Sequence, residues 1–170
     1  MNNSTLDIIK TILDKQMNMP KGRVWAYNGN QDLPQDNKLF IVLSFMARNP
    51  YSNNAKYVIT DEGMKEKQSV NMAEDILISL ISKNTEARDR VFEAPMALKS
   101  TYSQYIQELN NIHISTIGEV RDSSFLESTS RLNRWDVTCR VIRAYEKIQD
   151  VDYYDKFPNT SEFEPNLLVD

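Results

Sequence analysis

The residues that could carry chemistry in this chain are few and widely separated. The 170 residues include one histidine, His113, and one cysteine, Cys139. Any catalytic triad or metal cluster built on histidine would depend on His113 alone, and a position at the start of a predicted strand is typical of an ordinary strand-edge residue. Cys139 alternates with Val137 and Val141. This alternation predicts a buried thiol that packs rather than reacts.

Patterns that bind phosphate or metal ions are also weak. The four glycines, at positions 22, 29, 63 and 118, form neither a GxGxxG nor a GxxxxGK[ST] sequence, so no phosphate-binding loop is predicted. Several acidic groups could hold Mg²⁺ or act as a carboxylate pair, but solvated charge explains them more simply. We therefore predict no catalytic, cofactor-binding or metal-binding residue. The acidic groups are Asp61 with Glu62, Glu74 with Asp75, Glu86 with Asp89, and Asp150 with Asp152 and Asp155.

The composition predicts one folded domain that does not bind DNA directly. Hydrophobic residues make up 41% of the chain and charged residues 26%, which is typical of globular proteins. The net charge is −4 and the basic residues do not cluster, which argues against a DNA footprint or a polybasic membrane anchor. No apolar run approaches the roughly 20 residues of a membrane span, and the N-terminus lacks the pattern of a signal peptide. We expect a reducing, intracellular setting, which also suits a single cysteine.

The first third of the sequence predicts one helix and three strands. Apolar residues recur every three or four positions over residues 6–17, which indicates an amphipathic N-terminal helix. Residues 23–27 predict a short strand, and the almost wholly apolar residues 38–47 predict a strand that is covered on both faces. Residues 48–54 are typical of a turn. We expect residues 55–60 to form the next strand and to pair with the apolar strand as a hairpin.

The middle of the sequence predicts a long strand followed by a long helix. Residues 68–81 alternate between apolar and polar or small side chains, with Glu74 as the one charged exception on the apolar side. From residue 84 to residue 109 the apolar positions step by three or four, which predicts one long central helix that kinks or breaks at Pro95. A helix remains an alternative for the first segment. It would use Ala73, Ile76, Leu77, Leu80 and Ile81.

Two further strands and a polar, aromatic C-terminus complete the predicted fold. Residues 112–120 and 130–145 read as strands, and the second has two distinct faces. The class is α/β (α+β): a mostly antiparallel sheet packed against the N-terminal helix and the long central helix. We predict an α/β domain over residues 1–151 and an extended C-terminal arm over residues 152–170. The apolar face of the last strand holds Trp135, Val137, Cys139, Val141 and Tyr145, and the charged face holds Arg134, Asp136, Thr138 and Arg140.

A candidate partner interface combines this charged strand face with the apolar residues of the C-terminal arm. A charged outer strand face is often only solvated, but six large apolar side chains in a short irregular segment need a surface to cover. That surface belongs either to the same chain or to a neighbour. The candidate residues are Arg131, Arg134, Asp136, Arg140, Tyr153, Tyr154, Phe157, Phe163, Leu167 and Leu168.

The order of these elements resembles that of the neck or tail terminator proteins of tailed bacteriophages over about residues 4–150. The resemblance rests on the N-terminal helix, residues 23–27 with the apolar strand 39–46, and the strand-to-helix block 68–109. It also rests on residues 130–137, which are similar to the arginine-containing start of the family's last long strand. Pro95 and the length of the C-terminal arm depart from the family's pattern.

The resemblance implies a structural virion protein without a cofactor or catalysis. Such a protein forms a hexameric ring in the tail or neck of the virion, caps the tail tube and joins it to the head-side connector, and it assembles in the host cytoplasm. Its expected partners are further copies of itself, the tail tube protein, the connector or stopper protein and, in a contractile tail, the sheath terminus. DNA is expected only as passing cargo, and no membrane is involved. The alternatives are another head-tail joining or tube-associated virion protein and, less simply, a small metal-dependent hydrolase.

Overall fold

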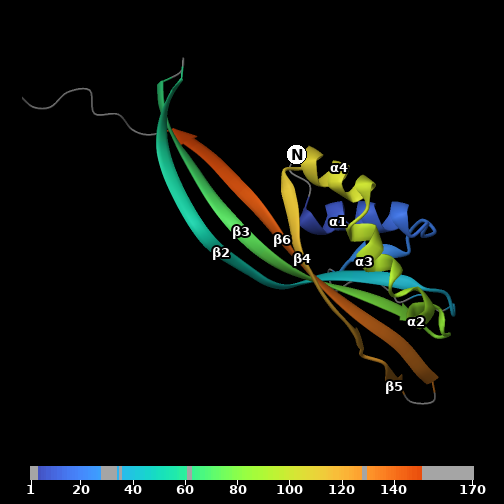
Figure 1. Ribbon diagram of the computed structural model, residues 1–170. Helices are drawn as coiled ribbons and strands as arrows, with labels where there is room; N and C mark the ends of the chain where they lie inside the picture. Colours follow the sequence, from blue (N-terminus) through green and yellow to red (C-terminus); the bar gives the residue numbers. More distant parts are fainter. Residues whose placement is uncertain (1–3, 28–33, 35, 61–62, 128–129, 151–170) are drawn as a thin grey trace, which may run out of the picture.

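A computed structural model describes residues 4–27, 34, 36–60, 63–127 and 130–150 of the chain (Figure 1). Helices and strands follow one another in the α+β order that the sequence predicts. The helices are α1 (Thr5–Gln16), α2 (Glu86–Arg90), α3 (Glu93–Leu98) and α4 (Thr101–Leu109). The strands are β1 (Val24–Ala26), β2 (Phe40–Thr60), β3 (Gly63–Ser82), β4 (Ile112–Asp122), β5 (Phe125–Glu127) and β6 (Ser130–Asp150).

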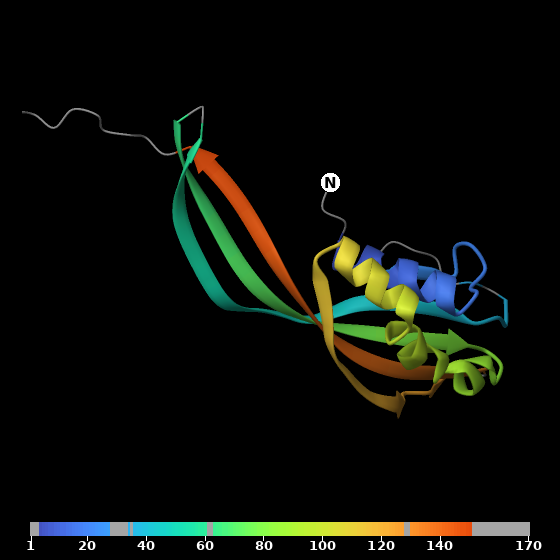
Figure 2. The same cartoon turned by 45° about the horizontal axis from the view of Figure 1, so that its top comes forward.

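The strands form one mixed, mostly antiparallel sheet with the order β1-β2-β3-β6-β4, and β5 pairs with β6. The pairing of β1 with β2 is parallel, and the other pairings are antiparallel. The helices gather over one face at one end of this sheet, whereas β2, β3 and β6 continue far beyond them (Figures 1 and 2). The molecule therefore consists of a helix-covered body and a long three-stranded extension.

The predicted N-terminal helix is confirmed, and it supplies much of the core. Its apolar stripe faces the sheet, and Asp7 lies in the first turn, where it favours the positive end of the helix. The opposing side chains come from β2, β3 and β6 at alternate positions, as expected for strands with one covered face. Fully buried residues of this core include Ile9, Ile12, Leu13, Ile41, Leu43, Ile76, Ile78, Leu80, Val137 and Val141.

The predicted turn at residues 48–54 is wrong, because β2 runs through it as one strand from Phe40 to Thr60. The register with β3 shifts between Phe45 and Ala47 and again between Pro50 and Ser52, so extra residues are absorbed as bulges. β1 pairs only as far as Leu43. Beyond that point β2 is an edge strand, which tolerates a proline. The hairpin partner of the whole strand is β3.

The strand predicted over residues 68–81 is confirmed, and the alternative helix is not formed. β3 is longer than predicted, because it begins at Gly63 and ends at Ser82. Its residues Ile76, Ile78 and Leu80 are fully buried against the helices. Their spacing of two is the pattern of a strand with one covered face.

The long central helix is wrong in detail, because the chain forms three short helices there. Pro95 lies in the first turn of α3, where its missing N–H is tolerated, so a new helix starts just before it. A second break falls at Ser100, whose backbone is extended and whose Oγ accepts a hydrogen bond from the Ser103 N–H at 3.1 Å. Serine is a strong N-terminal cap. The apolar periodicity continued across both breaks and hid the second one.

Candidate assembly surfaces

The β-extension is the part of the molecule that most needs a partner. It comprises residues 49–60 of β2, 63–73 of β3 and 144–150 of β6, which is about 40 Å of sheet at the usual rise per residue. No residue among those whose side chains are described here is buried, and no helix covers either face (Figures 1 and 2). Three strands without a covered face are only marginally stable in water.

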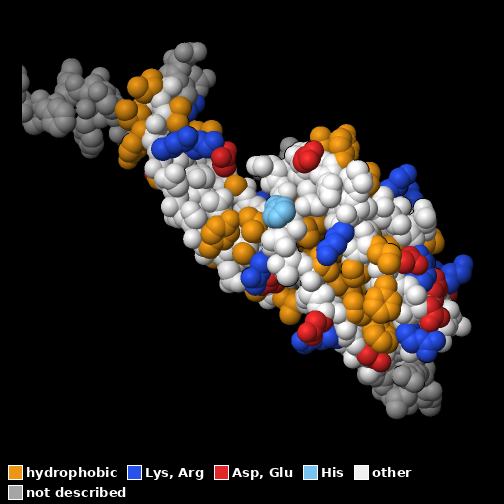
Figure 3. All heavy atoms as spheres, in the orientation of Figure 1, with side chains coloured by type: hydrophobic (Ala, Val, Ile, Leu, Met, Phe, Trp, Pro, Cys, Tyr) orange, Lys and Arg blue, Asp and Glu red, His pale blue; other side chains and the backbone are white. Residues whose placement is uncertain are grey.

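Large apolar side chains are exposed along this β-extension. Ile59 is 82% exposed and Tyr57 is 66% exposed, and orange side chains are visible near the tip in Figure 3. Single exposed apolar residues are ordinary, but several on one unsupported element indicate an interaction surface. The exposed large apolar residues of the β-extension are Tyr51, Tyr57, Val58, Ile59 and Ile148.

A buried carboxylate lies where the body meets the β-extension. Glu74 is fully buried on the helix-covered face of β3. Its Oε1 accepts hydrogen bonds from Arg48 Nε at 2.8 Å and from the Tyr145 hydroxyl at 2.9 Å. Arg48 also lies over the Phe45 ring, with 4.7 Å between the guanidinium carbon and the ring centroid. Because a buried charge is costly without a partner, this ion pair ties β2, β3 and β6 together at one level.

The first residue of α1 joins the same cluster. The Thr5 hydroxyl donates a hydrogen bond to Glu74 Oε2 and accepts one from Arg143 Nη1 at 3.3 Å. Arg143 is itself buried, and its guanidinium lies 5.1 Å from the centre of the Tyr145 ring. Helix α1 is therefore anchored at the junction by polar contacts as well as by its apolar stripe. The alternation of β3 had already marked Glu74 as an exception, whereas Arg48 was hidden in the predicted turn.

The sheet face opposite the helices carries the charged strand face that the sequence predicted. Asp136 accepts hydrogen bonds from Ser79 Oγ at 2.6 Å and from Arg134 Nε at 3.0 Å. Further along, Arg140 donates from Nε and Nη2 to the two carboxylate oxygens of Asp75 at 2.7 and 3.0 Å. The hydrogen bond from Arg140 lowers the pKa of Asp75 below its usual range. These charges are paired within the chain, so the face presents ordered ion pairs.

The remaining candidate interface residues divide into two groups. The backbone of Arg131 pairs with Leu126 in β5, at the end of the sheet opposite the β-extension. The C-terminal arm residues Tyr153, Tyr154, Phe157, Phe163, Leu167 and Leu168 lie outside the described residues.

Two hollows indent the open sheet face. One has a volume of about 480 Å³ and lies beside Asp75, Arg140 and the bulged residue Met46. Gly118 lines it at a point of close approach, because a Cβ atom added there would lie 2.1 Å from Thr138 Oγ1. The other, about 340 Å³, is lined by apolar and hydroxyl side chains together with Arg134. Trp25, one of its lining residues, stacks on Phe40.

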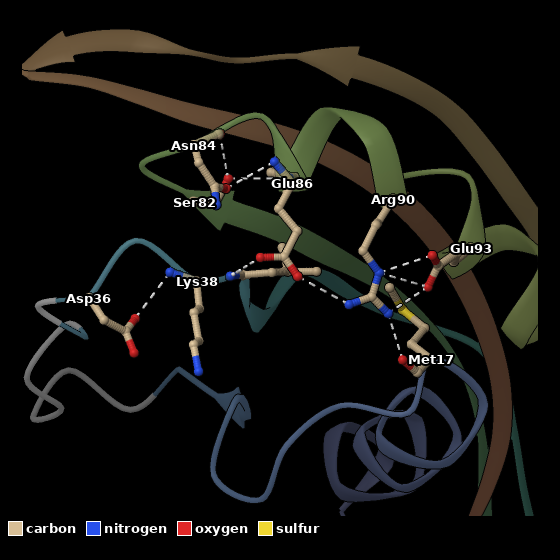
Figure 4. Close-up of polar contacts among 10 residues, drawn as sticks. Met17, Asp36, Lys38, Ser82, Asn84, Glu86, Arg90 and Glu93 are labelled. Atoms are coloured by element: carbon tan, nitrogen blue, oxygen red, sulfur yellow. Dashed lines mark hydrogen bonds and ion pairs between the residues drawn. The ribbon is translucent and has the colours of Figure 1, made fainter.

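A separate cluster of hydrogen bonds and ion pairs fixes the short helices to the body (Figure 4). Arg90 of α2 donates to the carbonyl oxygen of Met17 at 2.6 Å and to Glu93 at 2.7 Å. It also reaches Glu86, whose other carboxylate oxygen accepts the Leu39 N–H at 3.0 Å. One arginine thus links α1, α2, α3 and the start of β2. Of the acidic residues of α2, Glu86 therefore stabilises the fold, whereas the Asp89 carboxylate binds Thr85 and Arg88, close by in the sequence.

Among the described residues, those considered for chemistry do not come together, whereas Asp61, Glu62, Asp152 and Asp155 lie outside the described part of the chain. Burial raises the pKa of the Cys139 thiol to about 12, so the thiolate needed for nucleophilic attack is scarce at neutral pH. Glu74 and Asp75 point to opposite faces of β3 and bind different arginines. His113 lines a hollow of about 650 Å³ between α4 and β4. Within the described ranges, no three acidic, histidine or cysteine side chains are grouped as a metal site requires.

The described chain is a small α+β body with a β-extension that no helix covers. Residues 4–165 match the family model of the phage neck terminator proteins, and the chain belongs to that family. This confirms the resemblance found in the sequence, and it makes the protein a structural component of the phage neck. A comparison with curated proteins gives no match. Among the described residues no helix is long and apolar enough to cross a membrane.

Proposed function

We propose that this neck terminator forms a hexameric ring that caps the tail tube and joins it to the head-side connector. The observation that carries the proposal is the β-extension, whose sheet of about 40 Å has neither face covered by any described part of the chain. A ring supplies that cover, because each copy can place its β-extension against the next one. Such a head-to-tail contact uses two different surfaces on each subunit and closes into a ring when the rotation between subunits allows it.

The ring's lumen would let the genome pass without holding it. The chain has a net charge of −4, and the arginines of the open sheet face are bound to Asp75 and Asp136. On this face Arg134 and Arg140 are therefore already paired within the chain, and each phosphate contact that they do not make lowers the affinity for DNA. A wall that attracts DNA weakly suits a conduit. The partners in this proposal are further copies, the tail tube protein, the connector or stopper protein and, in a contractile tail, the sheath terminus.

The experiment is to measure the mass of the purified chain alone and after mixing with tail tubes of its phage. Native mass spectrometry and particle images are expected to give a ring of six copies with a central opening wider than a DNA duplex, free in solution or seated on tube ends. Binding along the length of the tubes, or to the connector without any contact to the tube, would instead indicate another head-tail joining or tube-associated protein. A chain that remains a monomer under both conditions would contradict the proposal.

A further inference from the structure

The outer edge of β2 is the longest unpaired strand edge in the described part of the chain. β1 pairs with residues Ile41 to Leu43 only, so β2 has β3 on one side and no described strand on the other from Ser44 to Thr60. An exposed strand edge offers a row of backbone donors and acceptors, which is a template for an added strand. Proteins usually protect such an edge, and this one is long and carries apolar side chains.

The two faces of the β-extension carry different side chains along this edge, although Val58 adds an apolar side chain to the face of Lys56. Tyr57 and Ile59 lie on the face that continues from the helix-covered side. Lys56 lies on the other face, directly opposite Lys67 in the register with β3. Like charges opposite each other in a sheet are unfavourable. Lys67 binds Glu146 at 2.8 Å, and Lys56, on the edge strand, is exposed to a partner.

One segment of this chain has the complementary pattern. In the C-terminal arm Phe163 stands between Glu162 and Glu164, so an extended chain presents one aromatic residue to one face and two carboxylates to the other. Pro165 follows and cannot donate to a ladder, so it would end an added strand. The arm as a whole, residues 152–170, holds five acidic residues and one lysine, a net charge of −4.

The arm also starts in a suitable place. β6 ends at Asp150, which pairs with Lys65 near the tip of the β-extension, so the residues that follow begin at the end that is farthest from the body (Figure 1). The 11 residues between Asp150 and Glu162 can span up to about 36 Å when extended. In the proposed ring this reach would bring the aromatic and acidic residues to the β-extension of an adjacent copy.

We propose that residues 160–165 of the C-terminal arm of one copy add as a strand to the outer edge of β2 in the next copy. Phe163 then packs beside Tyr57 and Ile59, and Glu162 and Glu164 face Lys56. The choice of a second copy rests on the proposed ring, in which β-extensions of neighbours are adjacent. A DNA partner fits less well, because it would leave the exposed Tyr57 and Ile59 uncovered.

The test is chemical cross-linking between co-expressed full-length copies that carry different cysteines. One copy carries Lys56→Cys with an affinity tag, and the other carries Glu162→Cys with a different tag. The buried Cys139 stays in place in both. A short bismaleimide linker is expected to give a covalent dimer that contains both tags. Its yield is expected to be at least fivefold higher than that of a control pair in which Lys99→Cys, at an exposed position directly after α3, replaces Lys56→Cys.

Charge reversal gives a second readout of the same contact. For this readout the cysteines are placed at other positions of the β-extension and of the arm. Lys56→Glu is then expected to reduce the yield of cross-links between two copies at least threefold. Combining it with Glu162→Lys and Glu164→Lys is expected to restore the yield. An equal yield from the Lys56 pair and the Lys99 control would overturn the inference. So would a cross-link that forms only within single chains when Lys56→Cys and Glu162→Cys are placed in the same copy, or a Lys56-dependent gel shift with duplex DNA and no cross-link.

The same samples separate this inference from the proposed function. Rings in native mass spectra without the specific cross-link would contradict the strand addition and leave the ring intact. The specific cross-link in dimers or open chains, with no closed ring even on tail tubes, would support the strand addition and contradict the ring.

Discussion

The guanidinium of Arg48 and the carboxylate of Glu74 meet at 2.7 Å between Nη2 and Oε1, at the level where the helix-covered body ends and the β-extension begins. Glu74 is fully buried, whereas the Arg48 side chain is 48% exposed. The pair therefore has one end in the core and the other near water. Together with Tyr145 and Thr5 it connects three strands and α1, so it fixes how the β-extension leaves the body.

Removing the buried carboxylate is expected to destabilise the body. Glu74→Ala leaves Tyr145 and the buried end of Arg48 without their acceptor, and the free energy of unfolding in urea is expected to fall by about 2–4 kcal/mol. Glu74→Gln keeps the side-chain volume and one of the two acceptor oxygens, and it replaces the other oxygen by an NH2 donor, so it is expected to lose less. Asp75→Ala, the neighbouring carboxylate on the open face, is the matched control and is expected to lose least. Equal stability of Glu74→Ala and the native chain would contradict a structural role for the cluster.

The ion pair between Asp75 and Arg140 predicts a specific pH dependence. The pKa of Asp75 is lowered by the hydrogen bond from Arg140, so the folded state favours the ionised form. Its contribution is complete above the ordinary aspartate pKa of about 3.9 and is lost as the pH falls through the lowered pKa. The native chain is therefore expected to have a higher Tm than Asp75→Asn at pH 7, and this difference in Tm is expected to shrink below pH 4. Because Arg140 is half exposed, added salt is expected to reduce the difference at pH 7 as well. A difference that grows on acidification would contradict this assignment.

Gly118 packs so closely against Thr138 that there is room for a hydrogen atom but not for a side chain at this position. A Cβ atom at this position would lie 2.1 Å from Thr138 Oγ1 and 3.4 Å from the Thr138 carbonyl oxygen. Gly118→Ala is therefore expected to lower the free energy of unfolding by about 1–3 kcal/mol, as overpacking does. Thr138→Ala in the same chain is expected to recover part of this loss. The measurement is a double-mutant cycle in urea, and additive effects of the two substitutions would rule out the clash.

The cap at Ser100 explains a break that apolar periodicity missed, and it can be tested directly. Ser100→Ala removes the acceptor for the Ser103 N–H and is expected to lower the free energy of unfolding by about 1 kcal/mol. Ser52→Ala, at an exposed position of β2, is the control and is expected to change little. If the two variants unfold alike, Ser100 does not stabilise the start of α4.

The sequence predicted the elements that bury one clear face and missed those whose neighbours decide their form. The alternation of residues 68–81 identified β3, and the two faces of the last strand were assigned correctly, since Val137, Cys139 and Val141 are buried. The turn predicted at residues 48–54 failed because Pro50 is compatible with an edge strand, and only the sheet order shows that β2 is an edge there. For the same reason the β-extension could not be foreseen. None of its residues whose side chains are described is buried, so only residues 68–73, which continue the alternation of β3, showed a pattern.

The exposed tip of the β-extension should matter for assembly and not for folding. Ile59 is 82% exposed, so Ile59→Lys removes almost no buried surface from the single chain, and its urea midpoint is expected to match that of the native chain. In a ring the same residue would be covered, and a buried lysine without a partner is costly. The fraction of chain in rings, measured by native mass spectrometry at equal concentration, is expected to fall at least tenfold. Met96→Lys, 71% exposed on α3 and remote from the tip, is the matched control and is expected to assemble normally. Unchanged assembly of Ile59→Lys would remove the β-extension tip from the contacts between copies, whereas loss of assembly in both variants would point to the helical face as a second contact.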